Sequence, residues 1–195
     1  MKRSLNIFRT GVIVFTMILP SLLFAQAKFH GQDLAISVTG TSSLHDWEMK
    51  SGKVKVDALI TVNNDKVSVT ALSFSMPVET LKSGHSMMDK NTYKAMDTKK
   101  NPNIMFVFTS VTSVTSSGVN TYLFKGAGKL TIAGTTKLTD MVATLKYNPA
   151  DKSLTFIGTK KIKMSEYGVK PPTAMLGTIK TGDAISINYN INIKS

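Results

Sequence analysis

Hydrophobic side chains recur at every second position over most of this chain, which is the spacing of β-strands with one buried face. The clearest case is 183–194 (DAISINYNINIK), where four isoleucines and a tyrosine alternate with serine and asparagine. The same alternation in 53–62 (KVKVDALITV) predicts another strand. Weaker versions bring the prediction to about eight strands, at 34–40, 53–62, 66–78, 103–114, 119–132, 136–147, 153–164 and 183–194.

The segment 66–78 (KVSVTALSFSMPV) changes phase within one strand. Its apolar positions are first Val67 and Val69, and then Leu72, Phe74 and Met76. A shift of one residue would turn the second group to the opposite face unless the strand contained an extra residue. The pattern therefore predicts a β-bulge between the two groups.

Short polar segments separate the predicted strands. SSG at 116–118, AGTT at 133–136 and NPADK at 148–152 are typical of hairpin turns. Many strands joined by short turns indicate an all-β, antiparallel sandwich or barrel. A barrel would also remove the exposed strand edges that an open sheet leaves.

Two segments interrupt the alternation. In 84–102, apolar and small residues fall at helical spacing after Ser86, a possible N-cap, and Pro102 ends the run, so we expect one short helix. In 166–183, two prolines and no strand period predict a long loop. Such a loop in a compact domain is usually functional or mobile, and it is long enough to cover a barrel mouth.

The first 27 residues have the layout of a secretory signal peptide. Three basic residues precede an apolar run from Gly11 to Phe24, and small residues follow at Ala25 and Ala27. The alternative is a retained membrane anchor, but the run is short for a bilayer core of about 30 Å and contains Pro20. We expect cleavage after Ala25 or Ala27, one domain over 28–195, and no anchor in the mature chain.

Composition narrows the class of protein. The chain has no cysteine, which excludes disulfides, thiolate metal sites and attachment of a lipid through cysteine. Its formal net charge is +12, yet no arginine follows Arg9, and the lysines are scattered. A chain without the planar fork of arginine is poorly equipped to read phosphates and bases, so we expect no nucleic-acid partner. These features fit a bacterial periplasmic or secreted protein.

The segment 40–48 (GTSSLHDWE) contains the only tryptophan and one of three histidines. His45 and Asp46 do not make a catalytic pair, because adjacent side chains of an extended segment point to opposite faces. The nearby serines lack the glycine-flanked turn of a nucleophile, and the isolated histidines lack metal-ligand spacing. We therefore expect no catalytic residue, no metal and no cofactor, and we expect Trp47 to close one end of the core or to face a ligand.

Three further segments resemble a known family. They are NPNIMFVFTSVTSV at 101–114, FKGAGKLTIAGTTKLTDMVATLKY at 124–147 and GTKKIKMSEYGVK at 158–170. Together with GTSSLHDWE they are similar to the YceI-like proteins over roughly residues 34–194. One departure lies in HSMMDKNTYKAM, where many members carry an Arg-Asp pair and this chain has Asp89 without an arginine.

The resemblance implies an exported, eight-stranded, antiparallel, lipocalin-like barrel with one short helix and a long apolar ligand, an isoprenoid lipid or quinone, inside it. It implies binding or carriage without catalysis. The alternatives are a stress-related or interaction scaffold with no lipid, and an enzyme that uses Asp89, His85 or Glu166 as acid or base. The oligomeric state stays open.

The residues themselves also favour an internal ligand, because barrels with eight strands can hold one small molecule. IMFVF at 104–108 is apolar on both faces, which predicts a core or cavity on one side and a packed helix on the other. Aromatic, leucine and flexible methionine side chains are the candidate ligand-binding residues. They are Trp47, Leu72, Phe74, Met76, Met87, Met88, Phe106, Phe108, Phe124 and Phe156.

Overall fold

The computed structural model describes residues 26–63 and 66–195, so the predicted signal peptide lies outside the described residues apart from its last two positions. The strands are β1 (Ala27–Ser42), β2 (Trp47–Asn63), β3 (Lys66–Pro77), β4 (Asn103–Gly118), β5 (Thr121–Ile132), β6 (Thr135–Asn148), β7 (Ser153–Lys163), β8 (Thr173–Ala174) and β9 (Ile179–Lys194). The helix α1 (Ser86–Ala95) and three 3-10 turns, η1 (Val78–Thr80), η2 (Met164–Tyr167) and η3 (Met175–Gly177), complete the order.

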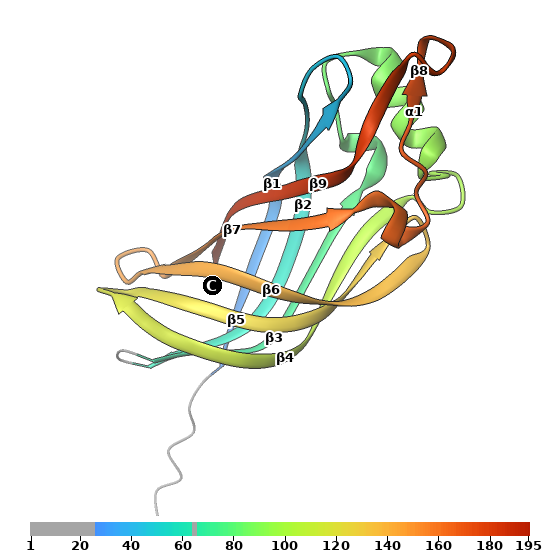
Figure 1. Cartoon of the computed structure of the whole chain (residues 1–195). Coiled ribbons are helices and arrows are strands. Elements are labelled where there is room, and N and C mark those ends of the chain that lie inside the picture. Colours follow the sequence, from blue (N-terminus) through green and yellow to red (C-terminus); the bar gives the residue numbers. More distant parts are fainter. Residues whose placement is uncertain (1–25, 64–65) are drawn as a thin grey trace, which may run out of the picture.

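Eight of these strands form a closed antiparallel barrel (Figure 1). Neighbours along the chain pair from β1 to β7, β7 pairs with β9, and β9 returns to β1, while β8 adds a short pairing to β9. The barrel with one helix that the sequence predicted is therefore confirmed, and closure leaves the barrel without an unpaired edge strand in the described part of the chain.

The alternation in the sequence is the inward–outward alternation of the barrel wall. In β2, Val54, Val56 and Ile60 are buried while Lys55, Asp57 and Leu59 between them are exposed. The pairing of β2 with β3 shifts at one point: Leu59 pairs with Ala71, but Ile60 pairs with Val69. β3 therefore contains one extra residue, Thr70, at this point. The predicted bulge is confirmed, and it keeps both apolar groups of β3 on the inner face.

β1 and β2 extend beyond their predicted segments. β1 pairs with β2 from Ala27↔Ile60 to Gly40↔Trp47, so the ends of both strands are set by their partners. Two register shifts on either side of Leu34 disturb the alternation of β1, which hides its first half from a pattern of period two.

One half of the barrel interior is tightly packed, and we call this half the floor. Its largest fully buried side chains come from six different strands: Phe29, Ile60, Phe124, Leu145, Leu154 and Ile193. The β4–β5 and β6–β7 hairpins lie at this end, and α1 and β8 lie at the other (Figure 1).

Two glycines of β5 make room for phenylalanines of β4. A side chain at Gly128 would collide with the ring of Phe106, and one at Gly126 would lie within 2.9 Å of the rings of Phe108 and Phe124. The rings can therefore approach the backbone of β5, because these inward positions carry no side chain. The outer face of β4 differs from expectation: no helix of the described residues packs there, and Met105 and Val107 are exposed to solvent.

The helix α1 begins at Ser86, so the residue in the N-cap position is His85 rather than the predicted Ser86. No side chain caps it; instead Asp89, in the first turn, accepts hydrogen bonds from the backbone nitrogen and hydroxyl of Ser83 at 2.8 and 2.7 Å. Tyr93 donates to the carbonyl oxygen of Leu81 at 2.6 Å. These bonds fix the helix beside the end of the barrel. No helix among the described residues has the length and apolar character needed to span a bilayer.

Candidate ligand-binding cavity

A cavity of about 480 Å³ occupies the half of the barrel opposite the floor. This volume falls within the roughly 300–1,000 Å³ typical of pockets that enclose a small molecule. Its wall is built by inward positions of the barrel strands, and α1 and the segment after η2 contribute at the open end. Most of the lining side chains are apolar, so the cavity suits a hydrocarbon chain.

The deep wall comes from strands that place side chains in the cavity at every second position. The contributors include Leu72, Phe74 and Met76 of β3, Phe106 of β4 and Phe156 of β7. Leu72, Met76, Phe106 and Phe156 are buried and Phe74 is half-buried. Because β-strand side chains alternate, one strand supplies a continuous apolar stripe along the cavity.

The mouth of the cavity lies between the β1–β2 turn, the start of α1 and the segment that leads into β9. Leu44 and Met87 line it while remaining 66% and 67% exposed, so they stand at the rim. Met88 lines the cavity next to them and is half-buried. Trp47 also lines it; its indole nitrogen donates to the carbonyl oxygen of Thr41 at 2.9 Å, which holds the ring in place.

The structure brings eight of the ten predicted ligand-binding residues together around this cavity: Trp47, Leu72, Phe74, Met76, Met87, Met88, Phe106 and Phe156. Phe108 and Phe124 are not in its wall, which corrects their predicted position. Their ring centroids lie 5.9 Å apart, and together they pack into the floor. That the other eight bind a ligand stays a prediction.

Several lining residues were missed at the level of the sequence. Ile185, Ile187 and Ile191 of β9 face the cavity, as do Met49 of β2 and Met141 of β6. The alternation of β9 had identified its isoleucines as one face of a strand, but only the closed topology shows that this face meets the cavity rather than the floor. The predicted loop 166–183 contributes too, through the residues near Pro172.

The wall between β6 and β7 carries the charged side chains of the cavity. Lys160 starts on the inner face of β7, and its Nζ contacts Oδ1 of Asp140 on β6 at 2.5 Å. The bond from Lys160 lowers the pKa of Asp140. Tyr189 of β9 donates to the carbonyl oxygen of Val142 at 2.8 Å, and burial, with a smaller contribution from Asp140, raises its pKa to about 12.

The candidate acids and bases do not assemble into a reactive group. The Nδ1 of His45 lies 2.6 Å from the backbone oxygen of Asp46, not from its carboxylate. Asp89 is engaged by Ser83, and Glu166 accepts a bond from the backbone of Lys163 at 3.3 Å. Within residues 26–63 and 66–195, no three His, Asp or Glu side chains are grouped so that they could hold a metal ion.

Known structures with this architecture share its fold at low sequence identity. BcnA of Burkholderia cenocepacia is 22% identical, with a TM-score of 0.60 over 80% of this chain and 95% of its own. A polyisoprenoid-binding domain from Saccharophagus degradans is 9% identical, with a TM-score of 0.63 over 88% and 99%. A YceI mutant protein of Campylobacter jejuni is 18% identical, with a TM-score of 0.50 over 70% and 79%. No curated protein matches the chain.

The model of the YceI-like domain matches residues 24–193. This range includes both sides of the cavity and every strand of the barrel, apart from the last residue of β9. The chain belongs to the YceI-like domain family.

Proposed function

We propose that this protein binds and carries a long apolar lipid, of the isoprenoid or quinone type, inside its barrel and performs no bond chemistry. The observation that carries the proposal is the cavity itself: about 480 Å³ of space, walled by leucine, isoleucine, methionine and phenylalanine, and open at one end. Water makes no hydrogen bonds with such an apolar wall, so replacing water in the cavity by a hydrocarbon chain is favourable in free energy.

The energetics suit a flexible chain. Burial contributes about 0.8 kcal/mol per CH₂ group, so ten buried groups contribute on the order of 8 kcal/mol before the costs of association. Methionines at Met76, Met88 and Met141 adjust their shape more easily than rings do, which favours a mobile chain over a rigid one. The Saccharophagus domain is described as polyisoprenoid-binding, and its likeness in fold supports the same class of ligand here.

The proposed place of action is the periplasm or the exterior of a bacterium. The basic, apolar and small-residue layout of residues 2–27 supports export. A carrier in this compartment would shield an isoprenoid chain from water between membranes.

The decisive test is organic extraction of the natively purified protein followed by mass spectrometry. We expect a copurifying isoprenoid or quinone. A protein that is folded yet empty, and that takes up no isoprenoid when one is added, would contradict the proposal and favour a scaffold without a lipid ligand.

A pair of matched variants ties the lipid to the cavity. Met88→Gln places an amide at the mouth and should lower the lipid recovered per folded protein, with folding checked by circular dichroism. Met105→Gln makes the same change on the exposed outer face of β4 and should retain full loading. A milder change in the deep wall, Phe106→Leu, should also lower loading. Equal loading in all three proteins would show that the ligand does not use this wall.

The absence of catalysis is tested on the same protein. Changing Asp89, His85 or His45 to Ala should remove no hydrolytic or redox turnover, because none is expected. Turnover that is present in the wild type and lost in one of these variants would make the protein an enzyme.

A further inference from the structure

The barrel wall has an opening between β6 and β7, here called the side gap. The ladder between the two strands runs from Asn148↔Ser153 only to Thr144↔Ile157. Beyond it, β6 still pairs with β5 as far as Thr135, and β7 with β9 as far as Lys163. Residues 139–143 and 158–162 therefore face each other without ladder hydrogen bonds, and the ribbons diverge there (Figure 1).

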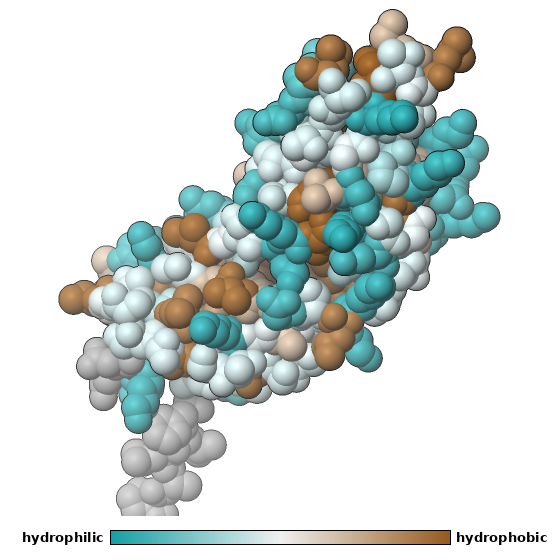
Figure 2. Space-filling view, viewed as in Figure 1, coloured by the Kyte–Doolittle hydropathy of each residue, from teal (hydrophilic) through white to brown (hydrophobic). Residues whose placement is uncertain are grey.

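The cavity reaches this gap. Thr139, Asp140 and Met141 on the β6 side and Lys160 on the β7 side all line the cavity. Apolar side chains are visible between hydrophilic ones in the middle of this face of the molecule (Figure 2). The interior is thus separated from water here by side chains rather than by backbone.

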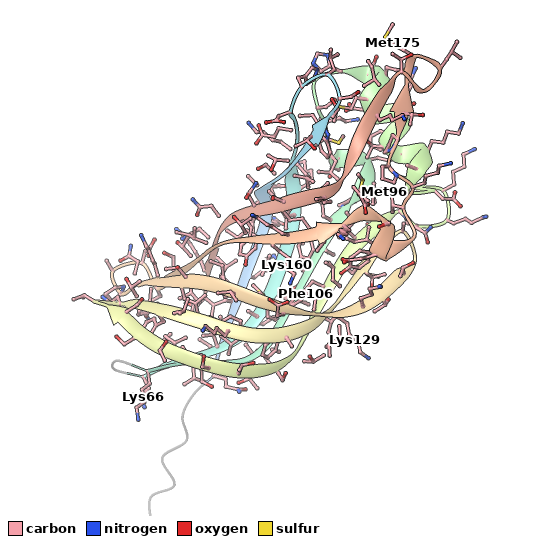
Figure 3. The ribbon with its side chains drawn as sticks, in the orientation of Figure 1. Lys66, Met96, Phe106, Lys129, Lys160 and Met175 are labelled. Carbon is pink, nitrogen blue, oxygen red and sulfur yellow. The ribbon has the colours of Figure 1, made fainter. Side chains whose placement is uncertain are left out.

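Two side chains cross the gap. Tyr189 lies against the inner face of Gly158, where a larger residue would collide with it, and bonds to the backbone of Val142. Lys160 extends from β7 toward Asp140, and Figure 3 places it between the ribbons of β6 and β7. Its side chain is 24% exposed and that of Asp140 is 75% exposed, so the pair has one end in the wall and one in water.

Lys160 is an unusual residue for its position. On β7 the inward positions continue from Phe156 through Gly158 to Ile162, and Lys160 falls in this series, whereas its neighbour Lys161 is exposed on the outer face. It is the only lysine among the described residues that line the cavity. A charge at an apolar wall costs free energy unless it is paired, and a largely exposed carboxylate repays little of that cost.

We propose that the side gap holds the anionic headgroup of the bound lipid, with the Lys160 ammonium as its counter-ion in place of Asp140. The inference rests on the proposed function, and it adds the place in the barrel wall that binds the head of the ligand, a phosphate or carboxylate at the end of a single apolar chain. The chain lies in the cavity while the head stays at the water-facing gap, so no charge of the ligand is buried without a partner.

The test measures binding of two ligands that share a chain and differ in the head. Delipidated protein is titrated with geranylgeranyl phosphate and with geranylgeraniol, and fluorescence of Trp47, which lines the cavity, reports binding. We expect the phosphate to bind at least about tenfold more tightly, the size of a charge-assisted hydrogen bond. In Lys160→Met the two affinities should converge, and in Lys160→Arg the preference should persist. Lys161→Met, one residue away on the outer face, should behave as the wild type.

Asp140→Asn separates a headgroup site from an ion pair that merely closes the wall. If Asp140 competes with the headgroup for Lys160, its replacement should raise the affinity for the phosphate and leave that for the alcohol unchanged. If the pair only closes the wall, Asp140→Asn and Lys160→Met should weaken both ligands equally, which would overturn the inference.

The remaining outcomes also decide between possibilities. Competition by inorganic phosphate alone at millimolar concentration would assign the site to a free anion and overturn the headgroup assignment. Wild-type protein that binds both ligands equally would overturn the headgroup site while the carrier function stands. Wild-type protein that binds neither would remove the carrier function and this inference with it.

Discussion

Phe106 and Phe124 lie on neighbouring strands and both point inward, but they face different surroundings. Phe124 is fully buried in the floor, whereas Phe106 has the cavity on one side. Truncation of a side chain costs more where every contact is lost than where the side chain already borders empty space. The role of an inward residue in this barrel therefore depends on its height along the strand.

Phe124→Ala should lower the free energy of unfolding by about 3–5 kcal/mol, because it leaves a cavity in a packed region. Phe106→Ala, measured by the same urea titration without ligand, is the matched control and should cost clearly less. Equal losses would mean that the cavity wall is packed as tightly as the floor.

Because of Tyr189, we expect the free energy of unfolding to fall at high pH. Burial raises its pKa to about 12, while in the unfolded chain it is about 10. Between these two values the unfolded chain releases the proton and the folded protein keeps it. Protonated Tyr189 therefore contributes roughly 2–3 kcal/mol to the free energy of unfolding below pH 10, and this contribution is lost as the pH rises toward 12.

The measurement compares urea unfolding of the wild type and Tyr189→Phe from pH 9 to pH 12. The lysines titrate in both proteins, so the difference between the two isolates the tyrosine. A difference that stays constant over this range would show that Tyr189 is solvated in the native protein.

At the scale of the element, the bulge in β3 separates two deletions that look alike in the sequence. Deleting Thr70 removes the extra residue and leaves every other residue of β3 on its present face, so we expect a folded barrel. Deleting Ser73 turns Phe74 and Met76 outward, at a cost of about 1.5–3 kcal/mol for each side chain. Soluble yield and circular dichroism distinguish the two variants; a folded Ser73 deletion would mean that the register of β3 is loosely held.

The strands show where sequence patterns suffice. Residues 53–62 of β2 and 183–194 of β9 alternate without interruption in the sequence, so the inward faces of these segments could be assigned from the sequence alone. The first half of β1 could not, because its register shifts depend on its partners. The predicted loop 166–183 combines η2, β8, η3 and the first residues of β9, whose short pairings are tertiary and leave no periodic trace.

The sequence predicted the kinds of side chain that line the candidate site, but not how far along the barrel axis each of them lies. Aromatic and methionine residues on inward faces were the right kind of wall, yet the sequence does not say that Phe124 lies in the floor and Phe106 at the cavity. Lys160 was in phase with Phe156 and Ile162, so a cation on the inner face was visible in the pattern. The side gap was not, because it exists only where the β6–β7 ladder stops.

The whole molecule should show a gradient of local stability. Amides in the floor half, such as those near Phe124 and Leu154, should exchange hydrogen only on global unfolding. Those around the cavity, near Lys160 and Ile185, should exchange faster in the empty protein and slow down when lipid is bound. Hydrogen exchange with mass spectrometry checks this; uniform protection along the strands would mean that the hollow half is as stable as the floor.

Export makes a prediction for the whole chain. β1 begins at Ala27, so cleavage after Ala25 leaves it whole and cleavage after Ala27 removes only its first residue. We expect the mature protein to start at Gln26 or Lys28 and to occur in the periplasmic or secreted fraction. N-terminal sequencing that finds Met1 in a membrane pellet would establish a retained anchor instead.

The floor has a consequence for how such a barrel can change over generations. Because residues such as Ile60 and Leu154 hold the fold together at one end, substitutions in the hollow half leave those contacts intact. Substitutions that change the shape of the cavity can therefore accumulate during evolution while the protein stays above the stability threshold that selection imposes. The same separation offers a designer a fixed base on which wall residues can be exchanged to admit a different guest.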